Sequence, residues 1–242
     1  DTKNLAGGKY RAEISIINEA GETLAEVSHT LKLIPVSLPA QKITVTQWLH
    51  ADCIADFYHI DVFSEEFWKA AENLVKRSVE SGSKMIYTPL FTPPLDTNPG
   101  KARTTVQLID VSETDGGYTF GFEKLHRWVN MCLKCGAEAF EMSHLFTQWG
   151  AFHAPKIMAG GKQLFGWDTD AAGKPYERFL SQFLPALCKE LYALGIGDKT
   201  VFNISHEPQL DHLESYRSAS RIVHKYLNGF KVMDAMSHTE FY

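Results

Sequence analysis

The pattern of hydrophobic and polar positions predicts a β-hairpin near the start of the chain. Between residues 10 and 34, apolar and polar residues alternate on both sides of a turn at residues 18–21, and this period of two is typical of half-buried strands. Pro35 and Pro39 then flank a short connector, and the period-two alternation does not continue after it. We therefore expect a domain boundary near residue 40. The candidate inward positions of the hairpin are Ile14, Ile16, Leu31 and Leu33.

From residue 41 onward, short β-rich runs alternate with amphipathic helices. Apolar residues recur at helical spacing in four segments, and each segment is followed by a glycine, as the carboxyl ends of helices often are. A repeated order of strand and helix is typical of a parallel sheet covered by helices. The expected strands are residues 43–49, 85–91, 138–143, 200–205 and 230–235.

The loops of this repeat point to a (β/α) barrel. Loops after the expected strands are long and rich in His, Trp, Asp and Pro, and barrel enzymes build their active sites from such loops at the carboxyl ends of the strands. The second of them contains Asp115-Gly116-Gly117, which predicts a further hairpin. An α/β fold of the doubly wound type is the alternative, but no G-x-G-x-x-G follows the first strand.

The barrel is expected to be incomplete in this chain. Residues 41–242 contain five expected βα units, whereas a closed TIM-type barrel has eight. The chain also opens with Asp1 rather than Met. We therefore expect a fragment truncated at both ends, whose missing strands come from the remainder of its own polypeptide.

Composition excludes several classes of function. The chain has 242 residues, 44% hydrophobic and 22% charged, as in an ordinary globular protein. Its net charge of −5 gives no reason to bind nucleic acid, and its apolar runs are too short for a membrane span, so neither partner is expected. Cys132 and Cys135 form a C-x-x-C without a second pair at zinc-site spacing. The sparse cysteines favour a reducing compartment such as the cytoplasm.

The most informative segment is the end of the fourth expected strand. Residues 202–208 read Phe-Asn-Ile-Ser-His-Glu-Pro, which places a carboxylate directly before a proline. Barrel enzymes keep catalytic groups at this end of their strands, so Glu207 is a candidate general acid. From position alone, a solvated glutamate that opens a loop is an equal alternative.

Five segments, in order along the chain, carry a resemblance to a known family. They are Thr46 to Asp52, Thr88 to Thr97, Trp149 to Ala151, Ala154 to Lys156 and Ser205 to Pro208. Together they resemble glycoside hydrolase family 123, the retaining β-N-acetylgalactosaminidases, and the last one resembles the S-D-E-P signature of that family. The resemblance covers residues 41–242. It also implies a β-sandwich before the barrel, so residues 1–40 are expected to be the end of such a domain and its linker.

The resemblance implies substrate-assisted catalysis, an exception to the two-carboxylate scheme. In the family, the 2-acetamido oxygen of the sugar attacks the anomeric carbon, a glutamate protonates the leaving oxygen, and the preceding aspartate stabilises the oxazolinium-like intermediate. By its place in the motif, Glu207 corresponds to this glutamate, which the resemblance implies acts first as the acid and later as the base. His206 stands where the aspartate is expected, and a neutral imidazole brings no negative charge. We therefore expect a hydrolase of terminal β-linked N-acetylhexosamine with weak or altered activity, and no cofactor.

Aromatic and polar residues near the expected strand ends fit a glycan substrate. Sugars present apolar C–H faces that stack on rings, and hydroxyls that need polar partners. The alternative for each tryptophan is a place between the sheet and the helices, and for the aspartate a capping role. The candidate glycan contacts are Trp48, His50, His144, Trp149 and Asp234.

Two other classes of function remain open. His50, Asp52, His59 and Asp61 could hold the metal of a metal-dependent barrel hydrolase, although their spacing matches no known ligand signature and the family uses no catalytic metal. Because His206 replaces the aspartate, a carbohydrate-binding pseudoenzyme is the second alternative. Metal analysis tests the first class, and a binding assay beside a hydrolysis assay tests the second.

Overall fold

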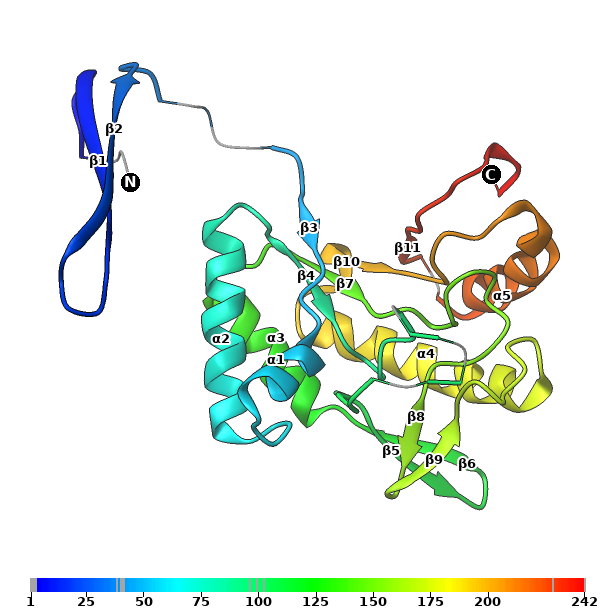
Figure 1. Ribbon diagram of the computed structural model, residues 1–242. Helices are drawn as coiled ribbons and strands as arrows, with labels where there is room; N and C mark the ends of the chain where they lie inside the picture. Colours follow the sequence, from blue (N-terminus) through cyan, green and yellow to red (C-terminus); the bar gives the residue numbers. More distant parts are fainter. Residues whose placement is uncertain are drawn as a thin grey trace. The chain divides into compact units, whose positions relative to one another are not determined.

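The chain forms two compact units, Asp1–Lys42 and Ile43–Tyr242. Each unit has its own β-structure (Figure 1). The computed structural model describes residues 4–37, 39, 42–95, 97–98, 100–101, 103–227 and 229–241. Asp96 of the second motif segment therefore lies outside the described residues, as do residues 38, 40 and 41 of the connector.

The first unit is an antiparallel hairpin of β1 (Gly8–Ile17) and β2 (Thr23–Leu33), as the alternation predicts. Its turn forms because the Asn18 side chain accepts hydrogen bonds from the backbone N–H groups of Ala20 and Glu22. Three of the residues expected to point inward are more than half exposed, namely Ile14, Ile16 and Leu31. The physical reason is that a two-stranded sheet has no second layer to cover a face within the described part of this unit.

The second unit contains a parallel sheet of five strands within the described residues. The strands are β3 (Thr46–Gln47), β4 (Met85–Thr88), β7 (Ala139–Met142), β10 (Thr200–Phe202) and β11 (Lys231–Val232). They are neighbours in chain order and all pair in parallel, which confirms the expected α/β alternation. The first and fifth strands are the sheet edges, as expected for strands that do not close on each other.

Helices connect the strands and lie beside the sheet (Figure 1). They are α1 (Ala51–Tyr58), α2 (Glu65–Glu80), α3 (Glu123–Lys134), α4 (Lys174–Ala193) and α5 (Leu213–Tyr226), with short 3₁₀ turns at Gly197–Lys199, Leu210–His212 and Thr239–Phe241. The start of α2 is fixed by Ser64, whose hydroxyl accepts from the N–H of Phe67. The sequence did not predict α1, because its 8 residues are too few for helical spacing to show. Within the described residues, each helix is too short or too polar to span a membrane.

The two faces of the parallel sheet carry different side chains. Successive strand residues point to opposite faces, so Ile86, Phe140 and Phe202 share one face, where they are buried in a single apolar core with the helices. Tyr87 and Glu141 lie opposite each other in register on the other face. The sheet therefore turns an apolar face to the helices and a polar face to the other side.

Two hairpins rise from the long loops after the strands. The first consists of β5 (Asp110–Thr114) and β6 (Gly117–Gly121), at the turn that the sequence predicts. The second consists of β8 (Ile157–Ala159) and β9 (Lys162–Phe165), and it lies beside the first in Figure 1. The sequence analysis missed the second hairpin, although its Gly160-Gly161 turn, with positive φ at both residues, is the signal that favours one.

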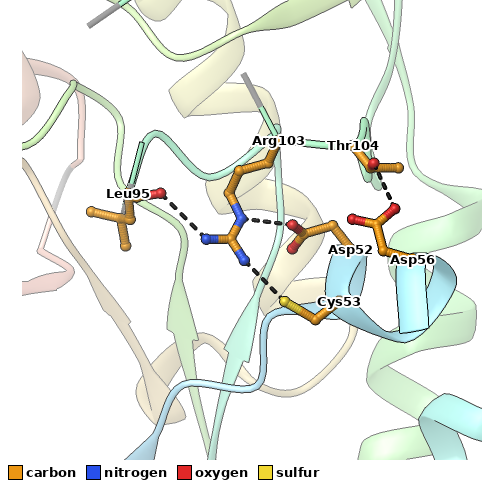
Figure 2. A network of polar contacts seen from close by, with 6 residues as sticks. All are labelled: Asp52, Cys53, Asp56, Leu95, Arg103 and Thr104. Atoms are coloured by element: carbon orange, nitrogen blue, oxygen red, sulfur yellow. Dashed lines mark hydrogen bonds and ion pairs between the residues drawn. The ribbon is translucent and has the colours of Figure 1, made fainter. Parts of the chain in front are cut away.

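A buried ion pair holds the loop after β4 against α1 (Figure 2). Nε of Arg103 lies 2.6 Å from Oδ2 of Asp52, and the two side chains are only 12% and 4% exposed. The same guanidinium donates to the carbonyl oxygen of Leu95 and reaches the Cys53 sulfur. Because a buried charge is stable only with its partner, this pair fixes both the loop and the start of the helix.

Arg103→Met should lower the free energy of unfolding by about 3 kcal/mol or more, because Asp52 then stays buried without its cation. Urea denaturation followed by tryptophan fluorescence measures the difference. The matched control is Arg77→Met: Arg77 pairs with Glu80 at 2.8 Å, but their side chains are 79% and 47% exposed. The expected loss there is below about 0.5 kcal/mol. Equal losses in the two variants would show that the buried pair contributes no more than a surface pair.

Candidate active site

A cavity of about 430 Å³ lies at the carboxyl ends of the strands, on the polar side of the sheet. Parallel strands all end at the same edge, so side chains far apart in the sequence meet there. The cavity lining comes from residues in or just after β3, β7, β10 and β11: Thr46, Trp48, Glu141, His144, Asn203, His206, Met233, Asp234 and Ala235. Among these described lining residues there are two carboxylates and neither a lysine nor an arginine.

Glu141 of β7 is a fully buried carboxylate in the cavity wall. Trp48 Nε1 and Asn203 Nδ2 each donate to its Oε1 over 2.8 Å, and the Thr46 hydroxyl donates to Oε2. These donors belong to β3, to the residue after β3 and to the residue after β10. A buried charge without partners costs several kcal/mol, so the carboxylate holds three strand ends in one arrangement.

His144, just after β7, is 1% exposed. Its Nδ1 lies 3.1 Å from the hydroxyl oxygen of Tyr87, whereas its Nε2 has no hydrogen-bond partner among the described residues. Burial lowers the pKa of His144 well below its ordinary value, and the neighbouring imidazoles of His206 and His50 act in the same direction. The ring is therefore neutral near pH 7 and presents one free polar atom.

Asp234, just after β11, is held by backbone N–H groups. Ser205 N donates to its Oδ2 over 2.8 Å, and Ala235 N donates to its Oδ1 over 3.0 Å. Burial raises the pKa of Asp234 to about 7, although these hydrogen bonds and one from Tyr216 act in the opposite direction. Near neutral pH, the carboxyl group is therefore present in both its protonated and its charged form.

Trp48 is the centre of a group of rings in the cavity. Its ring lies edge-on to the rings of His144 and His206, at centroid distances of 5.3 and 4.9 Å, and 5.6 Å from that of Tyr87. Edge-on contacts of this kind are the favoured geometry for aromatic pairs. Trp48 therefore fixes the orientation of both imidazoles while its Nε1 binds Glu141.

Glu207 lies beside the cavity on a loop with unusual backbone geometry. Its Oε2 is 3.9 Å from Nε2 of His206, and its side chain is 55% exposed. The φ angle of Glu207 is 46°, in the left-handed region that costs a non-glycine residue roughly 1–2 kcal/mol. Trp149, with φ of 57°, is also left-handed, and its N–H donates to the carbonyl oxygen of His206 over 2.9 Å. Strain of this kind concentrates at functional sites.

Comparison with known families places these residues in an enzyme domain. The model of the glycoside hydrolase 123 catalytic domain matches residues 48–242, which include most of the cavity lining. The chain belongs to glycoside hydrolase family 123. The family resemblance of the five motif segments is thereby confirmed.

The family 123 fold is shared with part of a solved structure. That structure is a family 123 glycoside hydrolase from Clostridium perfringens, and its description concerns glycolipid glycan hydrolysis. The two agree with a TM-score of 0.70 and 16% sequence identity, over 97% of this chain and 42% of the other. This chain therefore spans less than half the length of that protein, and the likeness concerns the fold. No curated protein matches the sequence.

The structure brings most of the site residues expected from the sequence together. Four of them line the cavity: Trp48, His144, His206 and Asp234. His50 lies next to them, with its ring centroid 6.1 Å from that of Trp48. Glu207 was expected to point into the cavity, but it is not among the described lining residues, because the left-handed turn leaves its side chain largely in solvent. Trp149, on the neighbouring loop, is 45% exposed.

The sequence analysis missed Glu141 and Thr46. Both lie inside expected strands, whereas most of the candidate site residues lie at or after the expected strand ends. Glu141 is nevertheless the single charged residue of the segment Ala139–Met142, and charged residues are rarely buried without partners. An acidic residue in the middle of an apolar strand is the signal that could have identified it.

One group of described side chains is arranged so that it could hold a metal ion. His144, His206 and Asp234 each offer a ligand atom, and these atoms lie within 4.8 Å of one another. The set that the sequence suggested, which consists of His50, Asp52, His59 and Asp61, does not form such a group among the described residues. The physical reason is that the two pairs lie at opposite ends of α1, with His50 and Asp52 at its start and His59 and Asp61 at or beyond its end.

The pair of Cys132 and Cys135 at the carboxyl end of α3 does not resemble a redox or zinc site. All the cysteines are free thiols, and Cys132 is buried in the core. Burial raises the pKa of the Cys132 thiol well above its ordinary value. A reactive or metal-binding cysteine needs a stabilised thiolate, so Cys132 acts as a small apolar core residue.

Glu141→Leu should lower the free energy of unfolding by about 3 kcal/mol or more, because each buried donor left without an acceptor costs about 1–3 kcal/mol. Glu141→Gln should cost about 1 kcal/mol, since its amide oxygen still accepts from Trp48 and Asn203 and the Thr46 hydroxyl can rotate to accept from the amide nitrogen. Urea denaturation measures both. Similar losses in the two variants would contradict a role for these hydrogen bonds.

Proposed function

We propose that this chain supplies the sugar site of a glycoside hydrolase for terminal β-linked N-acetylhexosamine, with N-acetylgalactosamine as the expected sugar. The observation that carries the proposal is the cavity at the strand ends. Its volume of about 430 Å³ lies within the range of roughly 300–1,000 Å³ that is usual for small-ligand sites. Its described lining combines two carboxylates with edge-on rings and contains no lysine or arginine.

The charge of the cavity favours glycoside cleavage of a neutral sugar. Positive charge develops at the anomeric carbon in the transition state, and carboxylates close to it lower its energy. The same carboxylates disfavour acidic sugars, because like charges would then be brought together. The family membership of the chain supports the same reaction class.

In the proposed mechanism, the sugar supplies its own nucleophile. The 2-acetamido oxygen attacks the anomeric carbon while Glu207 donates a proton to the leaving oxygen. Glu207 then accepts a proton from the water that opens the oxazolinium-like intermediate. An exposed acid beside the cavity suits this role, since the leaving group extends from the sugar towards solvent.

Position 206 changes how the intermediate is stabilised. His206 can accept a hydrogen bond from the acetamido N–H, but its neutral ring brings no negative charge. Asp234 has a carboxylate oxygen within 4.8 Å of a ring nitrogen of His206. We therefore propose that Asp234 contributes part of the negative charge that the expected aspartate would bring.

Glu207→Gln in the intact protein should lower kcat/KM for an alkyl β-N-acetylgalactosaminide by about 10²–10⁴-fold, because the amide cannot donate the proton that the leaving oxygen needs. A nitrophenyl glycoside should lose much less kcat/KM, since nitrophenolate leaves without protonation; kcat is not compared, because the later opening of the intermediate also uses Glu207. Steady-state kinetics with both substrates measure this difference.

The matched control for this experiment is Glu214→Gln, a change at an 85% exposed glutamate in the first turn of α5. It should leave both rates unchanged. An equal loss of kcat/KM on both substrates for Glu207→Gln would contradict acid catalysis by this residue, and an unchanged kcat/KM on the alkyl glycoside would exclude it.

His206→Asp should raise the turnover of an aryl β-N-acetylgalactosaminide by about tenfold or more, the lower part of what an electrostatic group of this kind contributes. The aspartate restores a negative partner for the oxazolinium-like charge, and it is smaller than imidazole. The measurement compares wild type and variant at the same pH and ionic strength. Should wild type be active and the variant no faster, the histidine belongs to a different mechanism or specificity.

A second candidate function is glycan binding without turnover, which His206 favours because it removes an expected catalytic charge. Calorimetric titration with N-acetylgalactosamine distinguishes the two. Sugar binding without hydrolysis in wild type, together with hydrolysis in His206→Asp, would establish the binding function.

A further inference from the structure

We propose that His144, His206 and Asp234 form a binding site for a divalent transition-metal ion of the zinc class at the wall of the cavity. The site does not depend on the proposed hydrolase function, because it requires only the three side chains. It also differs from the metal site that the sequence suggested, with which it shares no residue.

The ligand atoms are close to the separation that a metal ion needs. They lie within 4.8 Å of one another, whereas atoms bound tetrahedrally at about 2.0–2.1 Å are separated by roughly 3.4 Å. His206 and Asp234 are only partly buried, so small side-chain rotations can close the difference. Two imidazoles and one carboxylate form a common ligand set for zinc, with a fourth position left for water or substrate.

The buried imidazole is the independent sign that a ligand belongs in the site. His144 is 1% exposed, and its Nε2 has no hydrogen-bond partner among the described residues. A buried polar atom without a partner is costly, and this one belongs to a residue that lines the cavity. A metal ion bound to Nε2 would satisfy it.

The other ring nitrogen of His144 is held by a polar partner. Its Nδ1 lies 3.1 Å from the Tyr87 hydroxyl, and metal-binding histidines are oriented by an oxygen that accepts from their other ring N–H, usually a carboxylate, a backbone carbonyl or water. Asp234 is likewise oriented by the backbone N–H groups of Ser205 and Ala235. A cation bound to Asp234 would share the carboxylate with these donors and with the Tyr216 hydroxyl.

Charges around the site favour a cation as well. Glu141 lies in the same cavity wall as the three ligands, and neither lysine nor arginine is among the described residues that line it. A metal ion in this position would occupy the space in which the proposed function places the sugar. Cation and sugar are therefore expected to exclude each other.

The test is isothermal titration of the intact, EDTA-treated protein with Zn²⁺ in a buffer without chelators and without sugar. We expect one saturable site. Co²⁺ as a second probe should give the visible absorption of a four- or five-coordinate ion with nitrogen ligands. Because hydrolysis is measured separately, on the EDTA-treated protein, failure of the metal site and failure of the hydrolase function are distinguishable.

Variants locate the site. His206→Ala and Asp234→Asn should each weaken Zn²⁺ binding by at least about tenfold, and Tyr87→Phe by about 10–100-fold, as expected for a group that orients a metal-binding histidine. The control is His224→Ala, at an exposed histidine of α5, which should leave the affinity unchanged. Circular dichroism verifies the fold of each variant. Absence of saturable binding in wild type, or unchanged affinity in both His206→Ala and Asp234→Asn, would overturn the proposal.

Discussion

A carboxylate that is removed from water must be met by donors from several directions, and Glu141 sets this constraint for the whole strand-end region. Its donors belong to segments that lie roughly ninety and sixty residues away along the chain. Their distance in sequence means that the carboxylate is satisfied only when β3, β7 and β10 are correctly aligned. The alignment that satisfies Glu141 is also the one that gathers Trp48, His144 and His206 around the cavity.

Much of the fold follows from local patterns in the sequence. The strand and helix order, the parallel pairing and the hairpins at residues 18–21 and 115–117 were predictable, because periodicity and turn residues act over short distances. The strands are shorter than expected, since β10 ends at Phe202 rather than at residue 205. The residues that follow it do not continue the backbone hydrogen bonds of the sheet and instead bind side chains. Asn203 donates to Glu141, and Ser205 donates to Asp234.

Site residues at the ends of strands could be predicted from the sequence, whereas site residues whose role depends on burial could not. Trp48, His144, His206 and Asp234 could be found because parallel strands all end at the same edge of a sheet. Glu141 could not, and neither could the His144 nitrogen that lacks a partner among the described residues, because burial and hydrogen bonding are properties of the assembled sheet. The orientation of Glu207 depends on a left-handed backbone angle that no residue type at that position indicates.

The hydrogen bond from Trp149 N–H to the His206 carbonyl joins two loops that each contain a left-handed residue. A change in the backbone of one loop therefore alters the backbone of the other. The two loops act as one unit although more than fifty residues separate them. For protein engineering, this means that a graft of the segment around Glu207 from another family member should also include that member's counterpart of residues 149–151. A library that randomises one loop alone would mostly sample mismatched pairs.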